Sequence, residues 1–234
     1  YWAFTERPTD DWQFMTLDLS TEQGRRRARY ELTWGDHGFL RVWFQNLHQI
    51  SDEMWRANQP SPEQIREHAR ERGIKTIINL RGESPKGYYL LEKEACEANG
   101  IDLVDFQMFS RDTPTPEKVH GARDLFETIK YPALMHCKSG ADRAGIMAVL
   151  YMHFRQGLPI RDAVEQLSFK YLHVKEGKTG MLDHFFQTYL KVEEDTGMSF
   201  MDWIDGPYDR LTVKEEFLRT CKAKLMVDRI LRCE

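Results

Sequence analysis

The chain has 234 residues, enough for one well-buried domain with additional segments or for two small domains. Hydrophobic residues make up 41% of it and charged residues 30%, a balance that excludes disordered and membrane-embedded classes. The formal net charge of −4 provides no overall attraction to nucleic acid or to an anionic membrane surface, so no nucleic-acid partner is expected.

Several further classes of protein are disfavoured by what the sequence lacks. No apolar run approaches the roughly eighteen residues that a membrane helix needs, so no integral membrane segment is expected. The first residues do not have the basic-then-apolar order of a secretory signal. The cysteines form no CxxC pair and the histidines show no ligand spacing. We therefore expect a cytoplasmic protein that uses no metal and no cofactor; its oligomeric state is left open.

The first elements of the chain become more regular with distance from the N-terminus. Residues 1–38 show no clear pattern and are predicted to be a peripheral extension. Residues 39–50 are rich in aromatic and β-branched side chains, which predicts a short strand or hairpin. The next helix begins after the capping residue Ser61 and ends at Gly73, before an apolar strand over 74–80.

The same alternation of helix and strand is repeated twice. A helix over 88–98 precedes a strand over 101–108, and a helix that begins after Thr115 precedes a strand over 132–137. Because consecutive strands joined by helices require crossover connections, the strands should lie parallel in one sheet with helices on its faces. The sequence therefore predicts an α/β fold.

The rest of the chain, from Arg143 onward, is predicted to be helical. The patterns favour one helix to about 156, one that begins near 161, one over 179–197 and a last one over 213–231. We accordingly predict a main domain over 39–197 and a helical C-terminal extension, residues 198–234, packed on that domain.

Residues 136–145, with the sequence HCKSGADRAG, carry the strongest chemical signal. They lie between an apolar strand and an apolar helix, where backbone N–H groups and the helix dipole make an anion cradle. Cys137 is a candidate nucleophile because such a cradle favours the thiolate. Arg143 presents a planar fork that fits two phosphoryl oxygens. Gly140 and Gly145 are expected to let the backbone approach the phosphate closely.

The order His, Cys, five residues, Arg, and then Gly two positions later resembles the signature of protein tyrosine and dual-specificity phosphatases. Residues 55–60 and 73–81 are similar to the front half of bacterial and atypical dual-specificity phosphatases, so the resemblance covers about 39–195. It implies the cysteine-phosphatase fold, with a central, mostly parallel sheet, and a metal-free mechanism through a cysteinyl-phosphate. It also implies the phosphoryl-binding loop residues Lys138, Ser139, Gly140, Ala141, Ala144 and Gly145, and a supporting His136 that orients the loop. Arg81, at the end of a strand, could line the pocket as a further supporting residue, but an arginine there is more often paired with a nearby carboxylate.

Two carboxylates are candidates for the general acid that the resemblance implies. Asp142 directly precedes Arg143, as in bacterial phosphatases active on phosphotyrosine and phosphoinositides and in myotubularins, where the loop aspartate is the proposed acid. Asp112 follows the preceding strand, where many dual-specificity phosphatases keep a mobile acid loop, and we favour it. In the alternative interpretation Asp112 is a solvated turn residue and Asp142 ties the loop through backbone hydrogen bonds.

Two positions depart from the family pattern. Ala144 stands where a Ser or Thr usually helps the thiolate to depart, so slow breakdown of the phosphoenzyme is expected. Ala141 stands where lipid-active relatives commonly have Lys.

The leading hypothesis is a phosphomonoesterase that acts on phosphotyrosine, a phosphoprotein, a phosphorylated small molecule or a lipid headgroup. A catalytically weak phosphate-binding module and a rhodanese-like sulfurtransferase remain alternatives.

Overall fold

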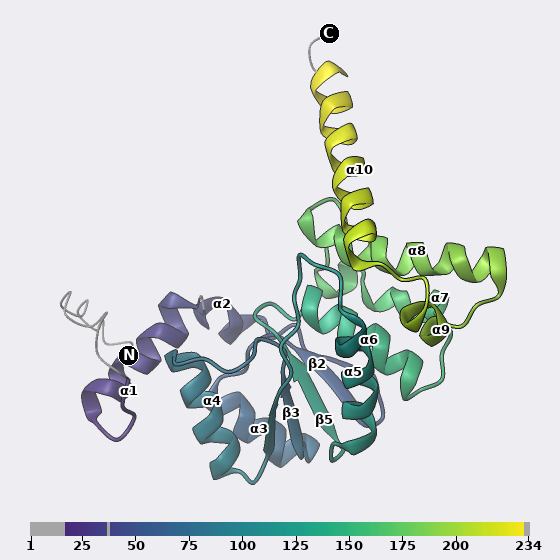
Figure 1. The fold of residues 1–234 in the computed structure, drawn as a ribbon. Coiled ribbons are helices and arrows are strands. Elements are labelled where there is room, and N and C mark those ends of the chain that lie inside the picture. The colour runs from purple at the N-terminus through teal and green to yellow at the C-terminus, as the bar shows by residue number, and fades with distance from the viewer. Residues whose placement is uncertain (1–16, 37, 232–234) are drawn as a thin grey trace.

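One five-stranded sheet organises the computed structural model, which describes residues 17–36 and 38–231 (Figure 1). The strand order is β1-β2-β5-β3-β4, with β1 antiparallel to β2 and all other neighbours parallel. The predicted α/β class with a mostly parallel sheet is therefore confirmed. The strands are β1 (His48–Ser51), β2 (Met54–Ala57), β3 (Thr76–Asn79), β4 (Asp102–Asp105) and β5 (Ala133–His136).

Helices precede β1, alternate with the strands from β2 to β5, and follow one another after β5. They are α1 (Glu22–Tyr30), α2 (Gly38–Trp43), α3 (Pro62–Arg72), α4 (Gly87–Ala98), α5 (Pro116–Thr128), α6 (Asp142–Phe154), α7 (Ile160–Ala163), α8 (Met181–Thr196), α9 (Phe200–Asp205) and α10 (Arg210–Leu231). The shorter turns are the π-helical η2 (Glu31–Gly35) and the 3-10 helices η3 (Val164–Gln166), η4 (Phe169–Tyr171) and η5 (Lys178–Gly180).

Local signals located most helix ends correctly, with one error near the front. The Ser61 hydroxyl accepts from the Gln64 N–H, the Gln64 side chain accepts from the Ser61 N–H, and Gly73 ends α3 in the left-handed region. The strand predicted over 39–50 is wrong in its first half, which forms α2. A local contact accompanies the helix there: Arg41 of α2 donates to the carbonyl oxygen of Asp36, five positions earlier.

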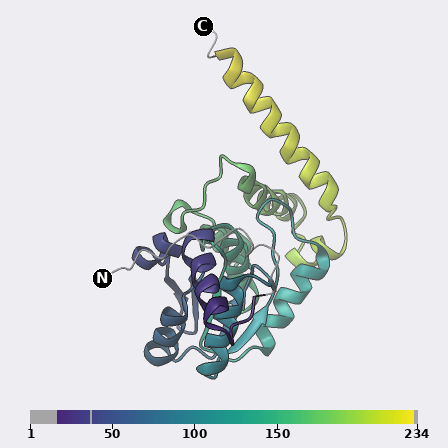
Figure 2. The same ribbon diagram turned by 90° about the vertical axis from the view of Figure 1, so that its left-hand side faces the viewer.

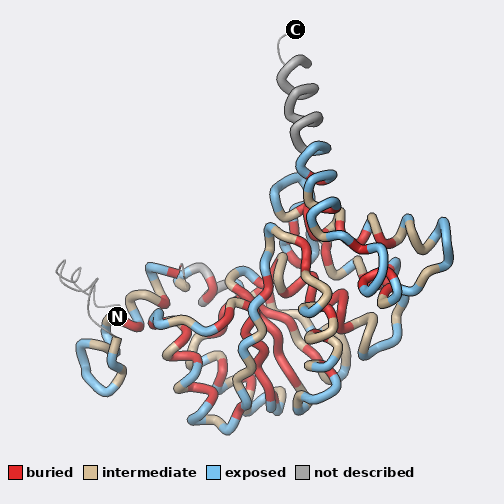
Figure 3. Tube along the Cα trace, viewed as in Figure 1, coloured by how far each residue is buried: buried red, intermediate tan, exposed pale blue. Residues whose placement is uncertain are grey.

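The two faces of the sheet are covered by different helices. Side chains alternate along the central strands, so Ile77 and Leu134 pack on the face covered by α3 and α4. Ile78 and Met135 belong to the larger core on the opposite face, which includes residues of α5, α6, α8 and α9. Figure 3 shows that the buried residues are concentrated along the sheet and on the inner sides of these helices.

The C-terminal part adds a helical layer beyond α6. Aromatic side chains of α8 and α9 contact each other, as in the pair Phe185 and Trp203, whose ring centroids are 5.4 Å apart. The last helix, α10, contacts α8 and then projects away from the body of the molecule (Figures 1 and 2). Within the described ranges, no helix has both the length and the apolar character needed to span a membrane. The domain limits predicted at residues 38 and 197 stay predictions.

Candidate active site

The segment 137–141 connects the end of β5 to the start of α6. Ala141, the residue before the helix, offers no side-chain cap to the first N–H groups of α6. Those groups are among the four at a helix start that have no partner within the helix. Gly140 has a φ of +75°, and a Cβ there would lie 2.7 Å from the carbonyl carbon of Ala57. Only glycine fits this turn.

All the carbonyl groups from residue 138 to residue 141 are bound from outside the loop. The Gln59 N–H donates to the Lys138 oxygen at 3.4 Å. The Asn46 side-chain amide donates to the Ser139 oxygen at 2.9 Å. The two remaining oxygens, those of Gly140 and Ala141, accept hydrogen bonds from the Arg56 guanidinium. Since these four C=O groups are engaged on the outer side of the loop, its N–H groups are left for the inner side.

Arg56 is fully buried, and its guanidinium binds the backbone of the loop. It lies on β2 and its Nη2 donates to the oxygens of Gly140 at 2.8 Å and Ala141 at 2.9 Å. Its Nη1 donates to the Gln166 oxygen at 2.7 Å, and its guanidinium lies 4.1 Å from the centre of the Tyr171 ring. Burial lowers the pKa of Arg56 to about 10, so it remains a cation at neutral pH.

Cys137 and Arg143 stand at the two ends of this cradle. The Cys137 side chain is buried, and its sulfur accepts from the Gly140 N–H at 3.2 Å. The sulfur thus lies within the loop, at hydrogen-bond distance from one of its N–H groups. Arg143 is partly exposed, and no described residue forms a hydrogen bond or an ion pair with its side chain. Its donors are therefore free to bind an anion at the loop.

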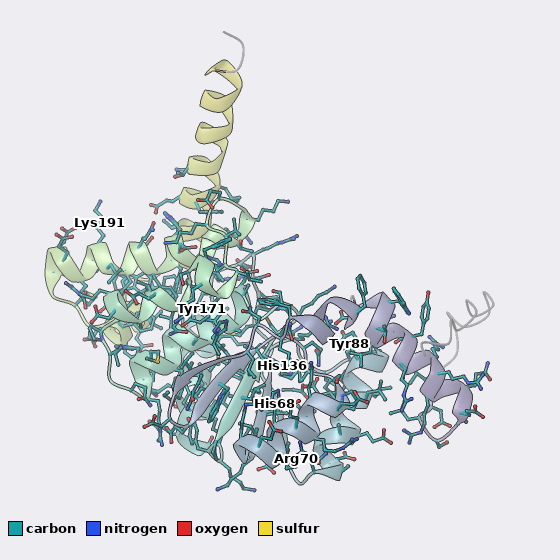
Figure 4. The ribbon with its side chains drawn as sticks, turned by 180° about the vertical axis from the view of Figure 1, so that it is seen from behind. His68, Arg70, Tyr88, His136, Tyr171 and Lys191 are labelled. Carbon is teal, nitrogen blue, oxygen red and sulfur yellow. The ribbon has the colours of Figure 1, made fainter. Side chains whose placement is uncertain are left out.

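A chain of polar side chains extends from His136, which lies in the interior of the molecule (Figure 4) directly before the loop, to the buried Asp36. His136 Nε2 lies 2.5 Å from Glu92 Oε1, and both side chains are buried. Gln59 donates to Glu92 at 2.8 Å and accepts from Arg81 at 2.8 Å. Through Glu92 and Gln59, this network connects the two supporting residues, His136 and Arg81.

Asp36 ends this chain and brings the N-terminal segment to the loop. Each of its oxygens accepts from Arg81 at 2.8 Å, and Arg41 and Lys138 approach it to 2.8 Å and 3.5 Å. Burial alone raises the pKa of Asp36, but the hydrogen bonds and charge of Arg81, with the other two cations, outweigh burial and hold it below its ordinary value. The expected pairing of Arg81 with a carboxylate is therefore observed.

Asp142, the first residue of α6, is bound by a buried histidine. His173 Nδ1 lies 2.8 Å from Asp142 Oδ1, and His173 Nε2 lies 2.6 Å from Asp183 Oδ2. Burial alone lowers the pKa of His173, but the hydrogen bonds to the two carboxylates outweigh it and raise the pKa to about 9. His173 is therefore an imidazolium at neutral pH.

Asp112 is bound by two cations of α10. Its Oδ2 forms a short contact with Arg210 Nη2, and its Oδ1 lies 3.2 Å from Lys214 Nζ. The Asp112 Oδ1 atom also accepts from the Thr113 N–H at 3.1 Å. These contacts hold Asp112 against the base of the C-terminal helix, so it is not the solvated turn residue of the alternative interpretation.

The other predicted loop residues have distinct surroundings. Ala141 and Ala144 are buried, whereas Ser139 is exposed. A Cβ at Gly145 would lie 2.6 Å from the Leu167 side chain and 3.5 Å from Arg56 Nη2. This glycine makes room for the packing of residues 166–167 and for Arg56, and its expected close approach to phosphate stays a prediction.

Sequence reasoning missed four residues that surround the loop. Arg56 was included only as part of a family-like segment, and Asp36 fell in the segment predicted to be peripheral. His173 was set aside because it has no ligand spacing. Because no strand is predicted over 54–57, the range of β2, nothing in the sequence marks Arg56 as a buried charge. The fourth is Asn46, which has a φ of +43° and binds the Ser139 oxygen.

Comparison with known proteins agrees with this geometry. Residues 45–184 match the family model described as a DSP-PTPase phosphatase fused to NAD+ kinase. Among solved structures, Tk-PTP in its active form has a TM-score of 0.50 at 18% identity, over 62% of this chain and 98% of that one. Pseudomonas aeruginosa TpbA has a TM-score of 0.49 at 15% identity, over 72% of this chain and 91% of that one. At 18% identity the likeness to Tk-PTP shows the fold alone. No curated protein matches.

Proposed function

The chain belongs to the DSP-PTPase phosphatase family whose model it matches, and from this premise we propose that it hydrolyses phosphomonoesters with Cys137 as the nucleophile. The observation that carries the proposal is the Gly140 N–H directed at the Cys137 sulfur at 3.2 Å, in a loop whose carbonyl groups are bound on the other side. That arrangement suits a thiolate beside a bound oxyanion.

The substrate phosphoryl group would be bound by inward N–H groups of residues 138–145 and by the guanidinium of Arg143. A bidentate guanidinium contact stabilises the charge that spreads over the equatorial oxygens in the transition state. In the first step Cys137 forms an S–P bond while the bond from phosphorus to the leaving oxygen breaks. In the second step water attacks phosphorus and the thiolate departs.

Protonation of the leaving oxygen requires an acid, and the contacts now favour Asp142 over Asp112. Asp112 is paired with a guanidinium and an ammonium group, which do not release protons near neutral pH. Asp142 lies directly beside Arg143 and is paired with the imidazole ring of His173, a group that can act as a proton shuttle. We therefore propose Asp142 as the general acid.

Release of phosphate from p-nitrophenyl phosphate tests the function. We expect release by the unmodified protein and none by Cys137→Ser, because an alcohol in place of the thiol is a poor nucleophile near neutral pH. Cys96→Ser is the matched control, since Cys96 is a buried thiol in the core beside α3. Equal activity of Cys137→Ser and the unmodified protein would contradict the proposal.

The same preparation distinguishes the two alternatives. Binding of inorganic phosphate without turnover of any phosphorylated substrate would indicate a phosphate-binding module. Formation of thiocyanate from thiosulfate and cyanide would indicate a sulfurtransferase. Phosphotyrosine peptides, phosphoinositides and phosphorylated small molecules, compared by kcat/KM, would then identify the substrate class, because fold alone does not determine it.

A further inference from the structure

A buried histidine outside the phosphate loop is clamped between two carboxylates that come from different helices. His173 follows η4, and its side chain has no exposed surface. Its Nδ1 is bound to Asp142 at the start of α6, and its Nε2 is bound to Asp183 in the first turn of α8. An ionised carboxylate can accept hydrogen bonds but cannot donate one. Both ring nitrogens of His173 must therefore carry a proton for both contacts to form.

The charges around His173 are few and can be named. Two carboxylates face its ring; Lys175 Nζ lies 3.7 Å from Asp183 Oδ1, and the buried Arg56 interacts electrostatically with Asp142. Asp142 Oδ2 accepts no hydrogen bond from any residue within 17–36 or 38–231, and the Asp142 side chain is 24% exposed. One oxygen of Asp142 is thus bound to the histidine, and the other remains available to a substrate.

We propose that His173 is a positioning residue that supplies, through Asp142, the proton taken up by the leaving oxygen. This inference rests on the proposed function. An ionised Asp142 cannot donate a proton, so an acid must first protonate it. The imidazolium of His173 is in hydrogen-bond contact with Asp142, and an imidazole can give up a proton and take one back, so it can act as a proton shuttle.

The proton balance of the two steps is complete with these groups. Asp142 takes the Nδ1 proton of His173, becomes a neutral carboxylic acid and, after rotation about its Cβ–Cγ bond, gives that proton to the leaving oxygen as the P–O bond breaks. His173 is then neutral, and its remaining proton is held on Nε2 by Asp183. When water attacks the cysteinyl-phosphate, its proton passes to Asp142 and returns to Nδ1 as the S–P bond breaks.

The decisive variant is His173→Asn, whose side-chain amide can retain a hydrogen bond to Asp142 but has no transferable proton. Phenyl phosphate, with a leaving group about as basic as tyrosine, needs the acid far more than p-nitrophenyl phosphate does. We expect kcat on phenyl phosphate to fall about 100-fold and kcat on p-nitrophenyl phosphate to fall less than about tenfold, with KM unchanged. His120→Asn, at a partly exposed histidine paired with Asp205, is the matched control and should change neither.

A second variant keeps the test valid if His173→Asn does not fold. Asp183→Asn leaves the Asp142–His173 contact but removes the other carboxylate, so the alkaline limb of kcat on phenyl phosphate should move from near pH 9 to lower pH by about one unit. Equal losses on both substrates, or an unshifted limb, would overturn the inference. Phosphate release that Cys137→Ser retains would instead overturn the proposed function, and it would be recognised by its independence of His173.

Discussion

Arg56 Nη2 is within 2.9 Å of two successive carbonyl oxygens, those of Gly140 and Ala141. A single buried side chain on β2 therefore fixes the backbone of a loop that follows β5, the adjacent strand. Its hydrogen bonds fix the orientation of these two peptide groups. They therefore also fix the direction of the N–H group in each of the two peptides. Binding of an anion by this loop then requires little rearrangement, which is the condition for effective electrostatic stabilisation.

Arg56→Lys should disturb the loop although the charge is retained. An ammonium group cannot replace the fork that reaches both loop carbonyls and the Gln166 oxygen, and an unsatisfied buried carbonyl costs about 1–3 kcal/mol. We expect the free energy of unfolding to fall by about 2 kcal/mol and kcat/KM to fall about 100-fold. Urea denaturation and steady-state kinetics measure the two effects. The exposed Arg70→Lys is the control, and parity between the two variants would refute the role of Arg56.

Gly140→Ala should be far more damaging than the same change at Gly100. Both glycines have positive φ values, +75° and +65°, so both variants carry backbone strain of about 1 kcal/mol or more. At Gly100 no atom lies within 4 Å of the added Cβ, whereas at Gly140 the backbone of residues 57 and 58 lies within 2.8 Å. Gly140→Ala should therefore lose about 3 kcal/mol of stability and its affinity for inorganic phosphate.

Calorimetric titration with phosphate and thermal unfolding of the two glycine variants give the comparison. Because Gly100→Ala shares only the backbone strain, it should retain phosphate binding. A Gly140→Ala protein that binds phosphate as tightly as Gly100→Ala would mean that the loop tolerates a Cβ against β2, contrary to the geometry described above.

Asp36→Asn should destabilise the protein at neutral pH and much less in acid. Removing the carboxylate leaves Arg81 and Arg41 without their buried partner, which costs about 3 kcal/mol. The pKa of Asp36 is lowered in the folded state, so its contribution is present above the unfolded pKa of about 4 and is lost as the pH falls through the folded value. The difference between variant and unmodified protein should thus shrink below about pH 4.

Urea denaturation at pH 7 and in acid measures this difference. Asp124→Asn removes an exposed carboxylate that is paired with Arg123, so it should change stability by less than about 1 kcal/mol. A pH-independent loss in Asp36→Asn would show that packing around residue 36, and not its charge, is responsible.

The parts of this site that the sequence predicted are local in the chain. The strand over 132–137, the loop and the helix that starts at Asp142 are contiguous, so periodicity and glycine placement were sufficient to predict them. The helical layer after β5 could be predicted for the same reason. The one wrong element, the first half of the strand expected over 39–50, is a segment whose structure depends on Arg41 reaching back to the Asp36 backbone.

The parts that could not be predicted depend on partners far apart in the chain. Arg56 and Gly140 are 84 positions apart, Asp36 and Arg81 are 45 apart, and His173 and Asp142 are 31 apart. A single sequence does not show which charged side chain will meet which. Topology makes these pairs: β2 lies beside β5, and the segment after η4 returns to the start of α6.

Ala144→Ser should accelerate the second chemical step. Ala144 is fully buried in the first turn of α6, directly after Arg143, where the family pattern has a hydroxyl that helps the thiolate to depart. Rapid mixing of the unmodified protein with p-nitrophenyl phosphate should give a burst of p-nitrophenol of about one equivalent and then slow release, because the thiolate leaves without that donor. The variant should speed the slow phase by about tenfold and leave the burst rate unchanged.

Ala148→Ser, one turn further along the same buried helix, controls for the insertion of a hydroxyl. Linear progress without a burst in the unmodified protein would mean that breakdown of the intermediate is not the slow step.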